Sequence, residues 1–454
     1  MQNQPPRQPD TGTGTTTALP PGGGVFGPRL LSVFGFSRGR NYAFIVVAVI
    51  FASLLIAAGV RGAPGVLIPP LERSFGWSRD VISLSAAIGI FLYGLMGPFA
   101  AALMESIGLR RTLIGALALM SAATAASTLM TEPWHLMLTW GVLSGLGSGC
   151  VAVVLGATVV NRWFKTNRGL IMGLLTASTA TGNLIFMPFL AALAQNGGWQ
   201  PVVWCVALAC AVLIPLVFFL LPERPSSIGL QPYGTEGHYQ DPPRLQAKDL
   251  VSRTLGTLWH AMGHRAFWLL FATFFICGFT TNGLVGTHLI ALCGDMGIPE
   301  FRAAGLLALM GLFDLFGTTG SGWLTDRYDP RKLLFVYYGI RGLSLVYLPY
   351  SDFTVYSLTI FAVFYGLDWI ATVPPTLRLA NEVFGDRDAP IVFGWIAAGH
   401  QIGAACASFF GGYMRTVQGN YVDAFVIAGS TGVIAAFLAL LIRDTSRAPA
   451  LATS

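Results

Sequence analysis

Long apolar segments recur along this chain of 454 residues, and two clear examples are residues 41–60 and 202–221. A run of about 20 apolar residues matches the thickness of the hydrocarbon core of a bilayer. In lipid only helices or closed barrels satisfy every backbone polar group, and barrel strands alternate polar with apolar residues. These segments do not alternate. The sequence therefore predicts an all-α membrane protein.

The composition supports this prediction, because 54% of the residues are hydrophobic and only 11% are charged. A soluble domain carries about 25% charged residues. The six cysteines lie in or beside apolar segments, with spacings that fit neither a zinc site nor a secreted disulfide framework. We expect no metal site and no cofactor, and we assign the net charge of +6 to orientation in the membrane and not to nucleic-acid binding.

Twelve segments fit a transmembrane helix, six on each side of a polar connection. They lie near residues 42–70, 81–104, 111–131, 136–160, 169–194, 201–221, 267–292, 301–325, 332–350, 354–377, 390–414 and 421–442. We expect a disordered cytoplasmic tail over 1–40, an N-terminal six-helix bundle over 41–221, a cytoplasmic connecting loop over 222–266, a C-terminal six-helix bundle over 267–443 and a cytoplasmic tail over 444–454.

The distribution of lysine and arginine predicts the orientation of these helices. If both termini are cytoplasmic, 21 of the 27 basic residues lie on the cytoplasmic side, 4 lie outside and 2 lie within spans. Positive residues concentrate on the cytoplasmic side of membrane proteins. We therefore expect a multi-pass protein of the cell inner membrane with both termini in the cytoplasm.

The two halves resemble each other at an offset of about 220 residues, which is typical of a transporter built from two parallel repeats. Glu105 corresponds to Asp326, and Asn161 corresponds to Asn381. In such architectures the substrate site lies near the membrane midplane between the halves.

One loop carries a family signature. Residues 322–327, Gly-Trp-Leu-Thr-Asp-Arg, are followed by Arg331 and Lys332 and resemble the loop motif of the major facilitator superfamily. The resemblance covers residues 42–442 and implies two six-helix bundles, with spans one, four, seven and ten lining a central cavity. It also implies a conformational switch at the cytoplasmic loops, formed by Glu105, Arg110, Arg111, Asp326, Arg327 and Arg331.

Other segments resemble the monocarboxylate transporters and the oxalate–formate antiporters. Residues 161–164, Asn-Arg-Trp-Phe, resemble the loop after their fourth span, and Asp314 matches their proton-linked acid. Where those transporters carry a carboxylate-binding arginine, four residues after the acid, this chain has Thr318. The resemblance implies transport of a monocarboxylate-like anion together with protons.

Four ionisable residues lie well inside predicted spans, where each charge costs at least about 2.5–3.5 kcal/mol and requires a partner or a water-filled cavity. Arg61 is the candidate that binds an anionic substrate, because a guanidinium gives a carboxylate two parallel hydrogen bonds. Its alternatives are an ion pair with Asp368 or an extended position with its charge at the membrane surface.

Asp314 and Arg341 are the second candidate pair. At about 1.5 Å per residue they lie roughly 18 Å and 14 Å from the same short loop, so the two side chains can meet. Two hypotheses follow: a permanent structural ion pair, or a proton switch in which Asp314 releases Arg341 when it is protonated.

Asp368 precedes the paired prolines Pro374 and Pro375, which should break or kink the tenth span. We assign Asp368 to substrate binding and to proton coupling, with a packing role as the alternative. His288 could titrate or bind a substrate, although a lone histidine is also commonly hydrogen-bonded in place. Asn282 is a further polar residue that could line the path.

Together these features predict a secondary active transporter of a small organic anion, coupled to protons and functional as a monomer. Export of an amphipathic or aromatic compound is the alternative within transport, and a non-transporting membrane sensor is the alternative outside it. We find no nucleotide-binding loop and no catalytic cluster, so the sequence argues against an enzyme.

Overall fold

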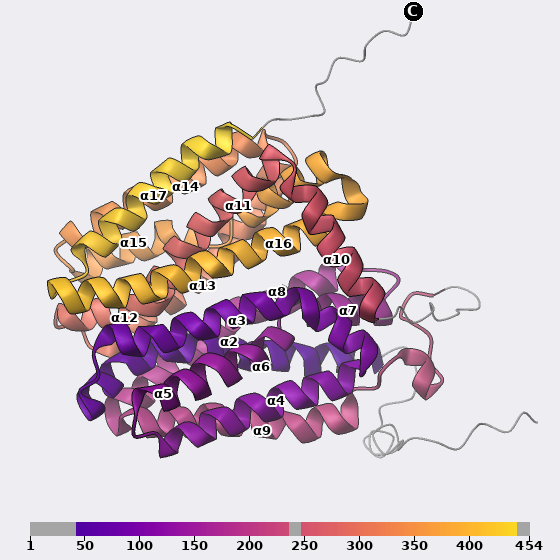
Figure 1. Ribbon diagram of the computed structural model, residues 1–454, viewed down its shortest axis with the longest axis horizontal. Helices are drawn as coiled ribbons and strands as arrows, with labels where there is room; N and C mark the ends of the chain where they lie inside the picture. Colours follow the sequence, from indigo (N-terminus) through magenta and orange to yellow (C-terminus); the bar gives the residue numbers. More distant parts are fainter. Residues whose placement is uncertain (1–41, 236–246, 443–454) are drawn as a thin grey trace, which may run out of the picture.

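The computed structural model describes residues 42–235 and 247–442. Within these ranges it contains twelve helical spans that are long and apolar enough to cross a membrane. They form two stacked bundles of six (Figure 1). The predicted all-α fold is confirmed. The tails expected over 1–40 and 444–454 lie outside the described residues.

The N-terminal bundle contains spans one to six. Four of these are single helices of at least 22 residues, and the fourth span is a chain of short helices with a π-helical segment. Its elements are α2 (Tyr42–Phe75), α3 (Arg79–Ser106), α4 (Leu109–Ala126), η1 (Ser127–Leu129), α5 (Pro133–Leu136), η2 (Met137–Leu143), α6 (Ser144–Cys150), α7 (Val153–Trp163), α8 (Arg168–Gly197) and α9 (Trp199–Leu220).

The C-terminal bundle repeats this arrangement with different breaks. The seventh span contains a π-helical segment, and the tenth span is interrupted before it continues into the eleventh. Its elements are α11 (Arg265–Gly278), η4 (Phe279–Val285), α12 (Gly286–Asp295), α13 (Glu300–Thr325), α14 (Pro330–Tyr347), η5 (Leu348–Tyr350), α15 (Val355–Asp368), α16 (Val373–Gln418) and α17 (Val422–Leu440). Gly385, at φ 74°, turns the chain between the tenth and eleventh spans.

Glycines allow the helices within each bundle to approach closely. A Cβ on Gly145 would lie 2.8 Å from the backbone oxygen of Gly89, and a Cβ on Gly342 would lie 2.5 Å from the oxygen of Gly429. Such small residues permit close packing in lipid, where helices gain no hydrophobic drive from association.

The connection between the bundles is not only a loop. It contains η3 (Pro225–Ile228) and a 16-residue helix, α10 (Ala247–Met262), so the prediction of a loop over 222–266 is wrong in this part. The sequence concealed α10 because the helix is too short and too polar to read as a span. It contacts α3 of one bundle and α16 of the other.

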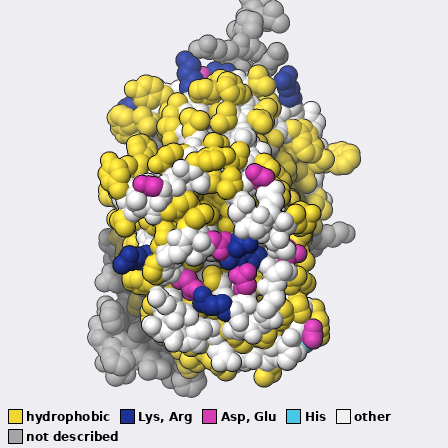
Figure 2. All heavy atoms as spheres, turned by 90° about the vertical axis from the view of Figure 1, so that its left-hand side faces the viewer, with side chains coloured by type: hydrophobic (Ala, Val, Ile, Leu, Met, Phe, Trp, Pro, Cys, Tyr) yellow, Lys and Arg dark blue, Asp and Glu magenta, His cyan; other side chains and the backbone are white. Residues whose placement is uncertain are grey.

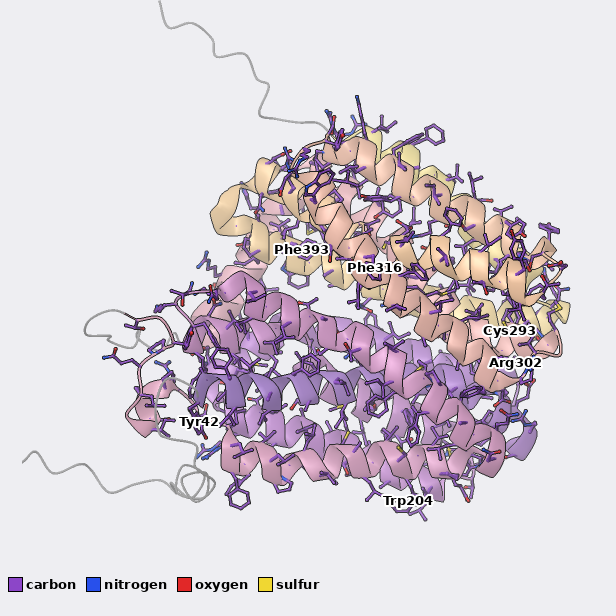
Figure 3. All side chains as sticks on the ribbon, turned by 180° about the vertical axis from the view of Figure 1, so that it is seen from behind. Tyr42, Trp204, Cys293, Arg302, Phe316 and Phe393 are labelled. Atoms are coloured by element: carbon purple, nitrogen blue, oxygen red, sulfur yellow. The ribbon has the colours of Figure 1, made fainter. Side chains whose placement is uncertain are left out.

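The described chain begins and ends at one end of the molecule, which we call the terminal face. Figure 3 shows Tyr42 at this end and both Cys293 and Arg302 at the other end, which we call the opposite face. Three helix pairs join the two bundles: α3 with α16, α8 with α13, and α2 with α12.

Candidate functional site

Arg61 on α2 extends toward α3, where its guanidinium lies 4.7 Å from the centre of the Tyr93 ring. Its Nη1 atom is buried and has no hydrogen-bond partner among the described residues. The aromatic face stabilises the cation without satisfying its N–H groups. A buried donor without a partner is costly, so the site has an unfilled place for an acceptor.

The contact between α2 and α12 fixes what lies beside Arg61. A Cβ on Gly65 would lie 2.9 Å from the backbone oxygen of Gly286, so the two helices touch there. Both spans run from the terminal face toward the opposite face (Figure 3). One helical turn back from this contact stand Arg61 and Asn282, which are both partly exposed. These two candidate substrate-binding residues therefore lie at one depth on adjacent helices of the two bundles.

Arg341 pairs with Asp368 and not with Asp314, so the predicted pairing of Asp314 with Arg341 is wrong. The Nε atom of Arg341 donates to Asp368 Oδ2 at 2.5 Å, and Nη1 lies 2.7 Å from the sulfur of Cys277. Its Nη2 donates to the backbone oxygens of Asp368 and Trp369. The alternative pairing of Asp368 with Arg61 is also not formed, because Asp368 is 5% exposed and faces Arg341.

Asp314 binds the other side of the same segment. Its Oδ1 accepts hydrogen bonds from the backbone N–H of Ile370 and from the hydroxyl of Thr318, each at 2.9 Å. The hydroxyl of Ser321 donates to the backbone oxygen of Ala371. Depth along each helix, estimated from the sequence, was not sufficient to reveal this arrangement, because the rotation of each helix decides which neighbour its side chains meet.

These contacts hold the break in the tenth span. α15 ends at Asp368 and α16 begins at Val373, which confirms the break predicted from the paired prolines. A broken helix leaves backbone groups without partners, and in a membrane each must be satisfied from elsewhere. Here an arginine from α14 binds the free carbonyls, and an aspartate from α13 binds a free N–H.

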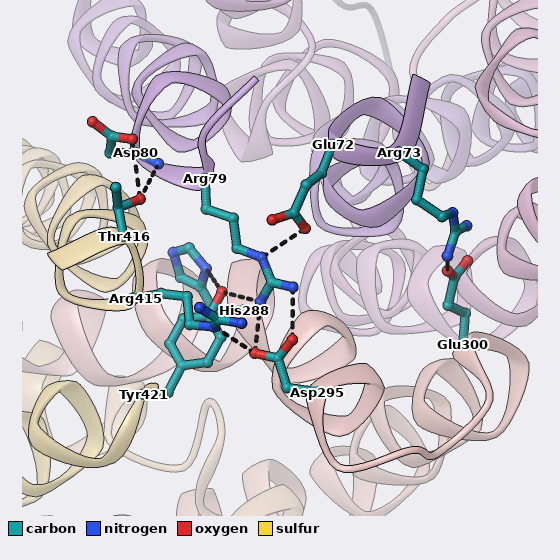
Figure 4. A network of polar contacts seen from close by, with 10 residues as sticks. All are labelled: Glu72, Arg73, Arg79, Asp80, His288, Asp295, Glu300, Arg415, Thr416 and Tyr421. Atoms are coloured by element: carbon teal, nitrogen blue, oxygen red, sulfur yellow. Dashed lines mark hydrogen bonds and ion pairs between the residues drawn. The ribbon is translucent and has the colours of Figure 1, made fainter. Parts of the chain in front are cut away.

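At the opposite face, Arg79 joins the two bundles (Figure 4). It stands at the start of α3, is 8% exposed, and forms a bidentate ion pair with Asp295 at the end of α12, with distances of 2.7 and 2.8 Å. It also donates to Glu72 at 2.9 Å and to the hydroxyl of Tyr421 at 3.3 Å. Arg415 on α16 binds the same Asp295 carboxylate at 2.7 Å. We call these five residues the Arg79 network.

Two further contacts flank the Arg79 network. Arg73 pairs with Glu300 at 2.8 Å, and the hydroxyl of Thr416 donates to Asp80 at 3.1 Å. Both join the N-terminal bundle to the C-terminal bundle. Figure 2 shows acidic and basic side chains gathered in the middle of this face, between hydrophobic sides.

His288 belongs beside this network and is not brought to Arg61. It is fully buried, its Nε2 lies 2.7 Å from the backbone oxygen of Ser408, and its Nδ1 lies 3.2 Å from the hydroxyl of Tyr421. A carbonyl only accepts, so Nε2 carries the proton and Nδ1 accepts from Tyr421. Both ring nitrogens are engaged, which leaves neither for a substrate in this conformation.

Sequence reasoning missed the Arg79 network, since Arg79 and Arg415 stand just outside the predicted spans 81–104 and 390–414. Their side chains belong to the ends of α3 and α16, which pack against each other. The sequence did contain one signal, because the acid Asp295 stands at the same end of the seventh span.

Removal of Arg79 should loosen the opposite face. An Arg79→Ala variant loses a bidentate pair, worth about 1.5–3 kcal/mol per charged hydrogen bond. We therefore expect the population of the conformation in which the bundles are separated at this face to rise about tenfold or more. The reporter is a cysteine at Ser83, which is fully buried between α3 and α16. Its labelling by a membrane-impermeant thiol reagent should accelerate by the same factor, with the native cysteines giving the baseline.

Arg73→Ala is the matched control for this experiment. Its ion pair also crosses between the bundles, but it is a single contact, and the Arg73 side chain is 61% exposed whereas Glu300 is 9% exposed, so we expect a smaller effect than for the bidentate pair of Arg79. Equal labelling rates in the two variants would show that the Arg79 network does not hold this face closed.

The loops at the terminal face fasten helix ends within each bundle. Glu105, at the end of α3, pairs with Arg162 on α7. In the other bundle Arg378 on α16 donates to the backbone oxygen of Thr325, at the end of α13. At this loop, where the resemblance predicts a switch contact of Asp326, the contact is made by the backbone oxygen of the preceding residue, Thr325.

The remaining predicted switch residues contact groups near them in sequence or in the same bundle. Arg110 lies over Phe218 at 5.6 Å, and Arg327 lies over Trp323 at 4.1 Å. Arg331 binds Asp329, at 2.7 Å, and this hydrogen bond lowers the pKa of the Asp329 carboxyl from its ordinary value. Arg111 is exposed on α4.

The fold and these loops agree with the comparison to known families. The family model of the Major Facilitator Superfamily matches residues 50–385. The chain therefore belongs to the major facilitator superfamily, whose members are transporters of small molecules and not enzymes, and it is a multi-pass membrane protein.

Two relatives align over most of the chain. An uncharacterized MFS-type transporter, YcxA, of Bacillus subtilis is 25% identical, over 78% of this chain and 83% of its own length. Monocarboxylate transporter 13 of Rattus norvegicus is 27% identical, over 85% of each.

Solved structures share the fold. A bacterial homologue of the human lysosomal transporter Spinster, in an inward-facing and unoccupied conformation, superimposes with a TM-score of 0.72 at 14% identity, over 89% of this chain and 97% of that one. The xylose transporter XylE of E. coli gives a TM-score of 0.65 at 15% identity, over 89% and 99%.

Proposed function

We propose that this protein is a secondary active transporter that moves a small organic anion across the cell inner membrane, together with protons, by alternating access. The observation that carries the proposal is the buried Nη1 of Arg61, which has no hydrogen-bond partner among the described residues and lies where the two bundles meet. A carboxylate would supply the missing acceptor and two charge-assisted hydrogen bonds. Asn282, at the same depth, would bind the uncharged part of the substrate.

The names of several relatives support an anionic substrate. One is a monocarboxylate transporter, and another, a gallate transporter of Pseudomonas putida, is 24% identical over 68% of this chain and 71% of its own length. Monocarboxylates and gallate share a carboxylate group, which is the group that a guanidinium binds best.

The excess of basic residues near the terminal face supports a cytoplasmic location for that face. The Arg79 network then lies on the outer side, where it joins the bundles. In alternating access, the two bundles must separate at the Arg79 network to admit a substrate from outside. The contacts of Glu105 with Arg162 and of Arg378 with Thr325 would adjust as the cytoplasmic side closes.

For proton coupling we favour Asp368 as the acceptor, with Asp314 and Arg341 as its neighbours at the break. Asp368 Oδ1 is buried and has no hydrogen-bond partner among the described residues, so a proton there leaves the Oδ2 pair intact at first. Neutralisation of the carboxylate would weaken its hold on Arg341, whose other N–H groups bind the broken helix. Protonation would therefore weaken the contacts that stabilise the break in the tenth span.

The test is uptake of a panel of labelled carboxylates, gallate included, by vesicles that contain the purified protein, with and without an inward proton gradient. We expect one acid to accumulate and the gradient to stimulate its uptake. Protein-free vesicles and a proton uncoupler are the controls. Absence of uptake across the panel, together with export of aromatic compounds from the same vesicles, would replace the proposal with its alternative.

A further inference from the structure

The helix between the two bundles, α10, presents an unusual outer surface. Leu255, Trp259 and Met262 are 47%, 80% and 37% exposed. At about 100° per residue these three side chains fall on one stripe of the helix. Trp259 is among the most exposed large apolar side chains of the described chain, and a tryptophan so exposed calls for a surface to cover it.

The inner surface of the same helix is firmly attached to the protein. Ala261 is 1% exposed, and Leu258 packs on the core of the C-terminal bundle. Two indole N–H groups bind the backbone of α10: Trp395 donates to the oxygen of Thr254 at 3.1 Å, and Trp268 donates to the oxygen of Met262 at 2.8 Å. The direction of the outer stripe is therefore fixed by the fold.

The position of α10 indicates what covers the stripe. The helix ends next to α11, the start of the seventh span, and it crosses the terminal face from one bundle to the other (Figure 1). Trp268 on that span is itself 48% exposed, so the apolar stripe continues into the lipid-facing side of the bundle. Tryptophan is enriched at the boundary between hydrocarbon and headgroups.

A basic edge borders the stripe. Arg253 and His260 are exposed on the side of α10 turned roughly 120° away from Trp259, and Arg265 is exposed just beyond the helix. Helices with an apolar stripe and a basic edge lie in the plane of the membrane surface, with the basic groups near lipid phosphates.

We propose that α10 is an interfacial helix, which seats Leu255, Trp259 and Met262 in the headgroup region of the cytoplasmic leaflet and directs its basic edge toward lipid phosphates. The inference takes from the proposed function only the cytoplasmic placement of the terminal face. The helix α10 contacts α3 in one bundle and α16 in the other. Any motion of the bundles relative to each other is therefore coupled to the position of α10 at the bilayer surface.

The experiment places a nitroxide label at residue 259 or at residue 253 of the full chain, in vesicles of phosphatidylcholine with phosphatidylglycerol. Arg253 is exposed on the side of the same helix turned about 120° away from Trp259, so residue 253 is the matched control. Cys205 and Cys406, the two cysteines that are not buried, are first replaced by serine. We expect the label at 259 to lie about 5–10 Å into the interface, with high exposure to oxygen and low exposure to a water-soluble nickel chelate. The label at 253 should show the reverse.

Nickel exposure at 259 equal to or greater than at the control position would overturn the proposal and indicate that a protein partner covers the stripe.

A second measurement uses the native side chain: a Trp259→Phe variant in vesicles with brominated lipids should show less lipid quenching of its tryptophan fluorescence than the parent. An unchanged quenched fraction would also count against the proposal. Neither measurement needs a transported substrate, so failure of the proposed function leaves both results interpretable. Phosphatidylcholine alone separates the two contributions: insertion should persist there and become shallower if the basic edge contributes.

Discussion

An Arg61→Ala variant is expected to lose transport of the organic anion by about 100-fold or more, with normal expression and normal assembly in the membrane. Each hydrogen bond between charged groups contributes about 1.5–3 kcal/mol, and the variant removes two of them from the bound anion. Alanine also removes a buried donor that has no partner in the empty protein, so folding should not suffer. The measurement is initial uptake of the acid identified in vesicles, at several concentrations.

Two further variants separate charge from geometry at this position. Arg61→Lys keeps the charge but cannot form the bidentate contact, so we expect intermediate uptake with weaker apparent affinity. Tyr93→Phe keeps the aromatic face over which Arg61 lies and should transport nearly normally. Normal uptake by Arg61→Ala would remove the anion site from this position, whatever the outcome for the other two.

An Arg341→Met variant is expected to be the most destabilising single change in the C-terminal bundle. It leaves the Asp368 carboxylate buried without its cation, and removal of one partner of a buried pair costs about 3–5 kcal/mol. It also removes the donor that binds the free carbonyls of the broken helix. We expect the melting temperature of the purified protein in detergent to fall by several degrees.

The double variant Arg341→Met with Asp368→Leu should recover part of this loss, because no charge then remains buried. Recovery should be incomplete, since the carbonyls of Asp368 and Trp369 lose their donor in both cases. Arg253→Met is the control for an exposed ion pair, because the side chains of Arg253 and Asp388 are 50% and 44% exposed, and it should change the melting temperature little. If Arg341→Met melts like the control, the pair contributes nothing to stability.

Hydropathy predicted the twelve spans because lipid leaves a chain few choices: every backbone group must be satisfied within the membrane, and only long apolar helices do so. The same reasoning failed for α10, whose 16 residues gain stability from contacts with both bundles and not from their own composition. A helix held by tertiary contacts leaves a weak signal in sequence.

The candidate site was predicted less completely. Arg61 and Asn282 were selected as polar residues of cavity-lining spans, and their helices do meet at Gly65. Arg341 was assigned to the wrong acid, because heights along two helices say nothing about how each is rotated. Asp314 and Asp368 both lie within reach of the break in the tenth span, and only the packed structure distinguishes them.

The charged groups inside the spans are divided between the bundles. Arg61 belongs to the N-terminal bundle, whereas Asp314, Arg341 and Asp368 all belong to the C-terminal bundle and contact one broken helix. Under the proposed function, the cation that binds the acid and the groups that respond to the proton gradient lie in separately encoded modules of one polypeptide, and Asn282 completes the acid site from the second module. A protein engineer could then exchange the N-terminal residues around Arg61 to alter which acid is accepted, without touching the contacts at the break in the tenth span.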